Sequence, residues 1–168
     1  MNTELLDVVD KNDHVINSLP RNQVHALKLC HRAIHILVFN QQGDLFLQKR
    51  SMKKDCGKGL WDTSVGGHVD AGETYLNCAL REIEEELGIK LGNNLHAIFK
   101  LSPSSQLGME FIQVYQCTHN GPFILHPDEI DEGGWFSSAT LTQRVLKGDP
   151  MLTDTFKTIW NQFLSTKS

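Results

Sequence analysis

Residues 67–89, GHVDAGETYLNCALREIEEELGI, contain a complete set of signals for a loop followed by a helix. The glycines near the start permit tight turns, Thr74 is of a type that caps helix N-termini, and Gly88 stands where many helices end in a left-handed residue. The pattern therefore predicts a helix from about Thr74 to Leu87. With ~100° of rotation per residue, one stripe of this helix is apolar and is expected to face the core; it consists of Leu76, Leu80, Ile83 and Leu87.

Three glutamates, Glu82, Glu85 and Glu86, share another stripe of the same helix. Carboxylates at positions i, i+3 and i+4 repel one another, and Arg81 is the one nearby cation in the sequence. A hard divalent cation relieves this repulsion, because Mg²⁺ prefers oxygen ligands and keeps waters or substrate phosphates in its other positions. Glu73 adds a fourth carboxylate at the entrance to the helix. The alternative, a merely solvated charged face, is disfavoured by the spacing and the glycines together.

These residues fill every defined position of a Nudix box, which the stretch resembles: Gly67, five residues, Glu73, seven residues, and then REIEEELGI from residue 81. The resemblance implies an α+β fold of the Nudix type, with a mixed curved sheet sandwiched between helices. Strand hairpins and C-terminal helices elsewhere in the chain favour the same α+β class. The resemblance also implies hydrolysis of a diphosphate linkage.

The same resemblance implies roles for individual residues. Its metal ligands would be Glu82, Glu85, Glu86 and the carbonyl of Gly67, with Mg²⁺ as the cofactor and Mn²⁺ as a possible substitute. Glu82 is the first candidate for the general base, and Glu110 and Glu129 are the alternatives. Arg81 is expected to orient the glutamates rather than touch the substrate. Arg81 and Glu85 are also predicted to be catalytic residues.

Basic residues gather at the end of a predicted strand, where they are expected to offset the charge of a substrate phosphate. Lys49 and Arg50 end this strand, and three more lysines follow in the loop of residues 51–59. Arg50 is the favoured phosphate ligand, because arginine can bind phosphate through two parallel hydrogen bonds. Glu73 is placed with the substrate-binding residues in a supporting role. A solvated surface is the alternative for each lysine.

Length and composition are typical of one soluble domain. The chain has 168 residues and a net charge of −4, which argues against broad binding of extended nucleic acid. The four cysteines form no C-x-x-C pair and are interpreted as reduced thiols. No apolar run approaches the ~18 residues of a membrane span, and the charged N-terminus does not resemble a signal peptide. We therefore expect a cytoplasmic protein without membrane contact.

We expect a single domain over 1–168, with 1–32 as an N-terminal hairpin and connection and 137–168 as C-terminal helices. Turn signals and apolar alternation predict a hairpin at 5–9 and 15–16, two paired strands at 33–39 and 45–50, and a short strand at 61–65. They also predict a hairpin at 95–101 and 109–117 and a short strand at 122–125. An acidic loop is expected at 126–134, then a short helix from 138 and a second helix from 149–150 to about 164.

The resemblance extends from about residue 5 to 135. Over this range the chain is similar to the branch of the Nudix superfamily that includes isopentenyl diphosphate isomerase, notably in CHRAIHILVFN, LQKRS and GLWDTSVGGHVDAGE. His31 and His68 match two metal-binding histidines of those isomerases, and His25 falls one residue from a third. Glu110 matches the carboxylate that moves protons. Gly66 stands where the isomerases have a catalytic cysteine, however, and Gly108 replaces another metal ligand.

The incomplete isomerase set and the complete box together favour hydrolysis. The alternative for His31 and His68 is that they are buried, hydrogen-bonded histidines; as ligands, histidines would favour manganese or zinc. The predicted substrate is a nucleoside diphosphate derivative or a similar small diphosphate. Two other functions stay open: an isopentenyl diphosphate isomerase-like enzyme, and a non-catalytic sensor of a diphosphate metabolite. A homodimer is compatible with either enzymatic function.

Overall fold

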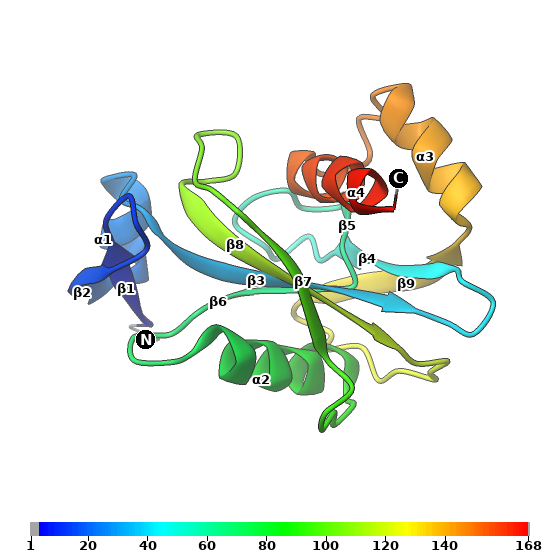
Figure 1. Ribbon diagram of the computed structural model, residues 1–168, viewed down its shortest axis with the longest axis horizontal. Helices are drawn as coiled ribbons and strands as arrows, with labels where there is room; N and C mark the ends of the chain where they lie inside the picture. The colour runs from blue at the N-terminus through cyan, green and yellow to red at the C-terminus, as the bar shows by residue number, and fades with distance from the viewer. Residues whose placement is uncertain (1–3, 168) are drawn as a thin grey trace.

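The computed structural model describes residues 4–167, which form a mixed sheet between helices and a smaller N-terminal unit (Figure 1). The main sheet has the order β5-β4-β3-β8-β7, with β6 paired to β3 and β9 paired to β4. β3 and β8 are parallel, whereas the other pairs are antiparallel. The predicted α+β class with a mixed curved sheet is confirmed. The strands are β3 (His31–Phe39), β4 (Leu45–Arg50), β5 (Trp61–Asp62), β6 (Val65–His68), β7 (His96–Leu101), β8 (Glu110–Thr118) and β9 (Ile130–Phe136).

Helices cover both faces of this sheet (Figure 1). Helix α2 (Tyr75–Leu87) lies on one face, and α3 (Ser138–Leu146) and α4 (Asp154–Thr166) lie on the other. Side chains that alternate along β4 divide between the two layers: Phe46 packs in the core beneath α2, and Leu45 packs in the core beneath α3 and α4. None of the helices within residues 4–167 is long and apolar enough to cross a membrane.

The predicted helix of the box is α2, and its two ends are as expected. The Thr74 side chain accepts a hydrogen bond from the Asn77 amide, and Gly88 ends the helix at φ 72°. Ile83 and Leu87 are fully buried, but the prediction that Leu76 faces the core is wrong, because its side chain is 46% exposed. In this first turn Cys78 and Ala79 fill the core side instead.

The N-terminal hairpin is confirmed as a separate two-stranded sheet followed by a short helix. It attaches to the loop that opens the box, where the Ala71 amide donates to the Leu5 carbonyl at 2.9 Å and the Gly72 amide donates to Asp7 Oδ2 at 2.9 Å. The unit therefore places its helix beside the box. Its elements are β1 (Leu5–Val9), β2 (Val15–Pro20) and α1 (Arg21–Ala26).

The strands predicted at 33–39 and 45–50 exist and pair with each other, but over a short distance. They meet only at Phe39 and Leu45 next to the turn. Beyond that point β4 pairs with β5 and β9, and β6 takes the place beside β3, from Ala33 opposite His68 to Ile36 opposite Val65. This rearrangement brings the glycine pair and His68 to the middle of the sheet.

The predicted strand at 122–125 is wrong, because this segment runs past the end of α2 instead of joining the sheet. The Ile124 amide donates to the Leu87 carbonyl at 3.0 Å, and the His126 amide donates to the Glu86 carbonyl at 3.1 Å. The acidic loop is also shorter than predicted, since β9 begins at Ile130. Gly133 belongs to that strand, where the Phe46 ring crosses it: an added Cβ would lie 2.2 Å from Phe46 Cζ.

The last helix begins later than predicted. Asp149 and Pro150 lie in a turn, in which Asp149 Oδ1 accepts from the Met151 amide at 2.8 Å. Helix α4 starts at Asp154, because the Thr153 side chain caps it by accepting from the Phe156 amide at 3.0 Å. The predicted apolar stripe is confirmed as core; it consists of Leu152, Phe156, Ile159, Trp160 and Phe163.

Candidate functional site

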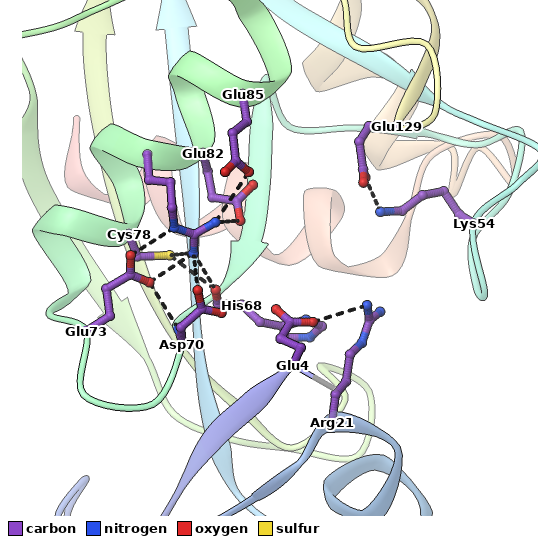
Figure 2. Close-up of polar contacts among 11 residues, drawn as sticks. Glu4, Arg21, Lys54, His68, Asp70, Glu73, Cys78, Glu82, Glu85 and Glu129 are labelled. Atoms are coloured by element: carbon purple, nitrogen blue, oxygen red, sulfur yellow. Dashed lines mark hydrogen bonds and ion pairs between the residues drawn. The ribbon is translucent and has the colours of Figure 1, made fainter. Parts of the chain in front are cut away.

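Arg81 binds three carboxylates of the acidic cluster, those of Glu73, Glu82 and Glu85, which Figure 2 labels. Its Nε and Nη2 each donate to Glu73 at 2.9 Å, and its Nη1 donates to Glu82 Oε1 at 2.8 Å and to Glu85 Oε2 at 3.4 Å. The hydrogen bond with Glu73 is the main cause that raises the pKa of Arg81. The permanently charged side chain therefore fixes these three carboxylates relative to one another.

Glu82 lies directly against the backbone of Gly67. A Cβ added at residue 67 would lie 2.3 Å from Glu82 Cδ and 2.5 Å from Glu82 Oε1. Glycine is required here because any side chain would occupy the space of the carboxylate. Burial raises the pKa of the Glu82 carboxyl.

Glu86 is the buried member of the acidic cluster, at 3% exposure. Gln48 Nε2 donates to Glu86 Oε1 at 2.8 Å and to the Ser64 carbonyl at 3.1 Å. Burial, and next the charge of Glu82, raise the pKa of Glu86 well above its usual value. Sequence analysis missed Gln48. Strand alternation provides a signal for it, because Gln48 shares the inward parity of Phe46 in the run LFLQKR.

The oxygen atoms of this cluster fit a hard divalent cation. Burial raises the pKa of both Glu82 and Glu86, and the charge of Glu82 raises the pKa of Glu86 further, so a cation beside Glu86 would remove an unfavourable interaction. The Glu85 side chain is 55% exposed, which leaves it open to the solvent side. These carboxylates are donors of the kind that Mg²⁺ or Mn²⁺ takes, and the backbone of Gly67 lies against one of them, Glu82.

A second cluster combines three histidines from separate parts of the chain. His25 comes from α1, His31 begins β3 and His68 ends β6, and one nitrogen from each lies within 4.8 Å of the others. The parallel register places Glu110 opposite His31. Its Oε2 lies 2.9 Å from His68 Nε2 and 3.3 Å from His31 Nε2. The structure thus brings His25 into the group, although the sequence match placed it one residue off.

The two ring nitrogens of His31 have different surroundings. Its Nδ1 lies 2.9 Å from the Leu29 carbonyl, a contact that requires the proton on Nδ1. Its Nε2 is buried and makes no well-formed hydrogen bond within the described residues, although Glu110 Oε2 lies 3.3 Å away. Burial, followed by the charges of His68 and His31, lowers the pKa of His25. Imidazole nitrogens that face one another in this way can hold a transition metal.

Glu110 is poorly placed to accept a proton. Burial alone would raise its pKa, but the contacts of its carboxylate with the rings of His31 and His68 outweigh burial and lower the pKa of Glu110 far below its usual value. The carboxylate is therefore stabilised in its charged form. Among the three candidates for the general base, this one has the weakest geometric support.

Two loops meet beside the acidic cluster. Lys54 pairs with Glu129, and the Ser51 amide donates to the Glu129 carbonyl at 3.0 Å. The charge of Glu129 contributes to the raised pKa of Glu86, so the two carboxylates are near each other. Figure 2 shows the Lys54–Glu129 pair facing Glu82 and Glu85 across the site.

The three residues predicted to bind the substrate or its phosphate, Arg50, Lys49 and Glu73, each have a different place in the structure. Arg50 Nε donates to the Cys56 carbonyl at 3.1 Å, and its Nη1 lies 3.5 Å from Asp62 Oδ2, so it braces the loop of residues 51–59. Lys49 follows Gln48 on β4, and strand alternation directs its side chain to the opposite face of the sheet. Glu73 binds Arg81 and accepts from the Asp70 amide at 3.0 Å, which is a supporting position.

Gly66 also lies under a side chain. A Cβ at this position would lie 2.8 Å from Cε1 of the buried His35. A larger residue would therefore require His35 to move. The site offers no ionisable group at residue 66.

Comparisons with known proteins agree with this architecture. The family model described as NUDIX domain matches residues 30–155. An uncharacterized Nudix hydrolase of Yersinia pestis is 35% identical over 150 residues, which cover 84% of this chain and 77% of that protein. Another, from a Nostoc species, is 32% identical over 158 residues and covers 93% and 94% of the two chains. The crystal structure of DR0079 from Deinococcus radiodurans matches with a TM-score of 0.76 and 31% identity, over 86% of this chain and 90% of that chain.

Proposed function

Because the chain belongs to the Nudix family of hydrolases that act on diphosphate bonds, we propose that it cleaves the diphosphate linkage of a nucleoside diphosphate derivative or a similar small diphosphate, using Mg²⁺ or Mn²⁺. The observation that carries this proposal is the position of three glutamates on one side of α2: Glu82 lies against the backbone of Gly67, shares Arg81 Nη1 with Glu85, and acts by its charge on Glu86. Such a concentration of negative charge suits a cation that in turn attracts a diphosphate.

The proposed mechanism assigns separate tasks to the residues of the cluster. A divalent cation bound by these oxygens supplies positive charge against the diphosphate and makes a nearby water more acidic. Arg81 holds the Glu82 carboxylate through Nη1 and the Glu73 carboxylate through Nε and Nη2. Gln48 holds Glu86 from the sheet side. The residues are thus oriented before the substrate arrives, which lowers the cost of reaching the transition state.

Glu82 is the favoured proton acceptor among the three candidates. Its carboxylate is bound on one side by Arg81 and lies against Gly67. Glu110 lies against two histidines and Glu129 pairs with Lys54, so all three candidates have a partner, and Glu82 differs in lying on α2 beside Glu85 and Glu86. Geometry therefore ranks Glu82 first.

The histidine cluster supports a second metal site, for Zn²⁺ or Mn²⁺, formed by His31 and His68 with His25 and Glu110. The support comes from the buried Nε2 of His31, which makes no well-formed hydrogen bond among the residues that the structure describes, and from the proximity of the three rings. Metal content after chelation and reloading with one equivalent of Zn²⁺ tests this site, with elemental analysis as the readout. His31→Gln should lose the bound zinc, whereas His96→Gln, at an exposed position of β7, should keep it.

Two other functions are weighed against hydrolysis. Isomerisation of isopentenyl diphosphate would use the histidine cluster and Glu110, but Gly66 has no side chain that could donate or accept a proton. A non-catalytic sensor of a diphosphate metabolite would not need the complete set of glutamates. Each alternative predicts a different outcome in the same assay.

The test is a panel of diphosphates, including ADP-ribose and other nucleoside diphosphate derivatives, incubated with Mg²⁺ and either wild-type protein or Glu82→Gln. Hydrolysis by wild type with a loss of at least about 100-fold in the variant supports the proposal. Double-bond migration in isopentenyl diphosphate would favour the isomerase. Binding without turnover on every member of the panel would favour the sensor.

A further inference from the structure

Two ion pairs connect the loops that border the acidic cluster. Lys54 pairs with Glu129, and Lys53 Nζ lies 2.8 Å from Asp128 Oδ1. The pairs differ in exposure: the Lys53 and Asp128 side chains are 69% and 64% exposed, whereas those of Lys54 and Glu129 are 23% and 38% exposed. The neighbouring lysines therefore have similar partners but different surroundings, and only Lys54 is withdrawn from solvent.

The inner pair lies close to the glutamates of the box. The loop that carries Lys54 follows β4, on which Gln48 binds Glu86. The backbone of Ser51, at the start of this loop, binds the Glu129 carbonyl. The Glu86 carbonyl accepts from the His126 amide at 3.1 Å, and the His126 carbonyl accepts from the Glu129 amide at 3.0 Å. The charge of Glu129 also acts on Glu86. A lysine held by Glu129 is therefore within range of an anion bound at the cluster.

Lys54 also differs from the nearby arginines in how its charged group is used. Arg81 uses Nε, Nη1 and Nη2 on protein acceptors, and Arg50 is bound to the Cys56 carbonyl and to Asp62. Within residues 4–167, the Lys54 ammonium has a single side-chain partner, Glu129. A lysine has three donors on a flexible stem, so it can exchange this partner without unfolding the loop.

We propose that Lys54 binds a phosphate group of the substrate, and that Glu129 holds this lysine beside the site until the phosphate displaces it. The inference rests on the proposed function, because it assumes that a diphosphate binds at the acidic cluster. Phosphate and carboxylate then compete for one ammonium group. Glu129 lowers the affinity for diphosphate, and Lys54 raises it.

This competition makes the two partners of one ion pair act in opposite directions. The probe is methylenediphosphonate, which has a P–C–P linkage that cannot be hydrolysed, and the measurement is its dissociation constant by calorimetry with Mg²⁺. We expect Lys54→Met to weaken binding by about 10-fold, as for the loss of one charged contact to phosphate. Lys53→Met is the matched control and should change binding by less than about 2-fold.

Glu129→Gln is expected to tighten binding by about 3-fold or more, because it frees Lys54. Removal of a negative charge near the ligand would also tighten binding, without any role for Lys54. The double variant Lys54→Met/Glu129→Gln separates the two explanations. If Glu129 acts through Lys54, then Glu129→Gln should have little effect in the Lys54→Met background.

Several results would overturn the inference. Equal binding by wild type and Lys54→Met, or the same gain from Glu129→Gln in both backgrounds, removes the exchange and leaves the proposed hydrolase intact. Absence of Mg²⁺-dependent binding by the wild type, together with no turnover of any diphosphate, overturns the inference and the proposed function together.

Discussion

The Glu82 carboxylate occupies the space that a side chain at Gly67 would need, with Glu82 Cδ 2.3 Å from the position of an added Cβ. The backbone of β6 and the acidic side of α2 are in contact at this point. The glycine that opens the box is thus explained by packing, because Gly67 lies within strand β6 and does not have a positive φ.

Gly67→Ala should disable the site without unfolding the protein. The methyl group must displace Glu82, and a displacement of about 1 Å in a reacting group commonly reduces activity by ~100-fold. Activity of the purified variant on the best diphosphate of the panel measures this effect. Gly92→Ala is the control, since an added Cβ there meets no atom within 4 Å. Full activity of Gly67→Ala would contradict the assigned contact.

Gln48→Leu should destabilise the metal-free protein, because it leaves Glu86 buried without its donor. A buried polar group without a partner typically costs about 1–3 kcal/mol. Urea unfolding in the presence of EDTA measures the loss, and the exposed Gln42→Leu serves as the control. The double variant Gln48→Leu/Glu86→Leu should lose less stability than the two single variants lose when their losses are added. Simple additivity would show that the two side chains do not depend on each other.

Asp13→Asn should loosen the N-terminal hairpin in a pH-dependent way. Burial raises the pKa of Asp13, but hydrogen bonds from Lys100, Arg32 and Tyr75 outweigh it and lower the pKa below 3.8. A lowered acid pKa contributes stability above about pH 4 that disappears as the pH falls through the folded-state value. We therefore expect a loss of about 2 kcal/mol at pH 7.

The loss of folding stability in Asp13→Asn should shrink toward zero in strong acid. Chemical denaturation of wild type and variant at pH 7 and in strong acid measures this change. Asp55→Asn is the control, because its side chain is 83% exposed and surface pairs contribute little. A loss that is the same at neutral and acidic pH would mean that the charge of the Asp13 carboxylate is not the cause.

Gly133→Ala should destabilise the pairing of β4 with β9. Its Cβ would lie 2.2 Å from Phe46 Cζ in a packed core, and overpacking commonly costs about 1–3 kcal/mol. Phe46→Leu in the same variant should recover part of this loss, because it removes the ring that clashes. Thermal unfolding of the two single variants and the double variant measures the coupling. If the double variant recovers no stability, the contact with Phe46 is not the cause of the loss in Gly133→Ala.

Sequence analysis predicted the parts of the fold that depend on local signals. Thr74 and Gly88 set the ends of α2, and the stripe of α4 was correctly assigned to the core. It failed where distant segments compete. Residues 33–39 and 45–50 have strong strand patterns, but a local pattern does not show that β6 takes the place beside β3. Gly133 resembled a loop residue because the Phe46 ring above it is remote in sequence.

The residues of the site also fall into those that a local sequence pattern predicts and those that depend on distant segments. The glutamates and Arg81 lie within one helix, so their grouping follows from helical periodicity. Gln48 and Lys54 approach the cluster from β4 and its following loop, and His25 approaches from α1. Their positions depend on strand register and on docking of the N-terminal unit, which no spacing rule within one segment provides.

The most direct test of the central claim is a crystal of the protein soaked with Mn²⁺ and measured at the manganese absorption edge. We predict anomalous density among the carboxylates of Glu82, Glu85 and Glu86, next to the Gly67 carbonyl. No density there, with Glu82 and Glu85 still bound to Arg81, would contradict the claim that this acidic face is a divalent-cation site.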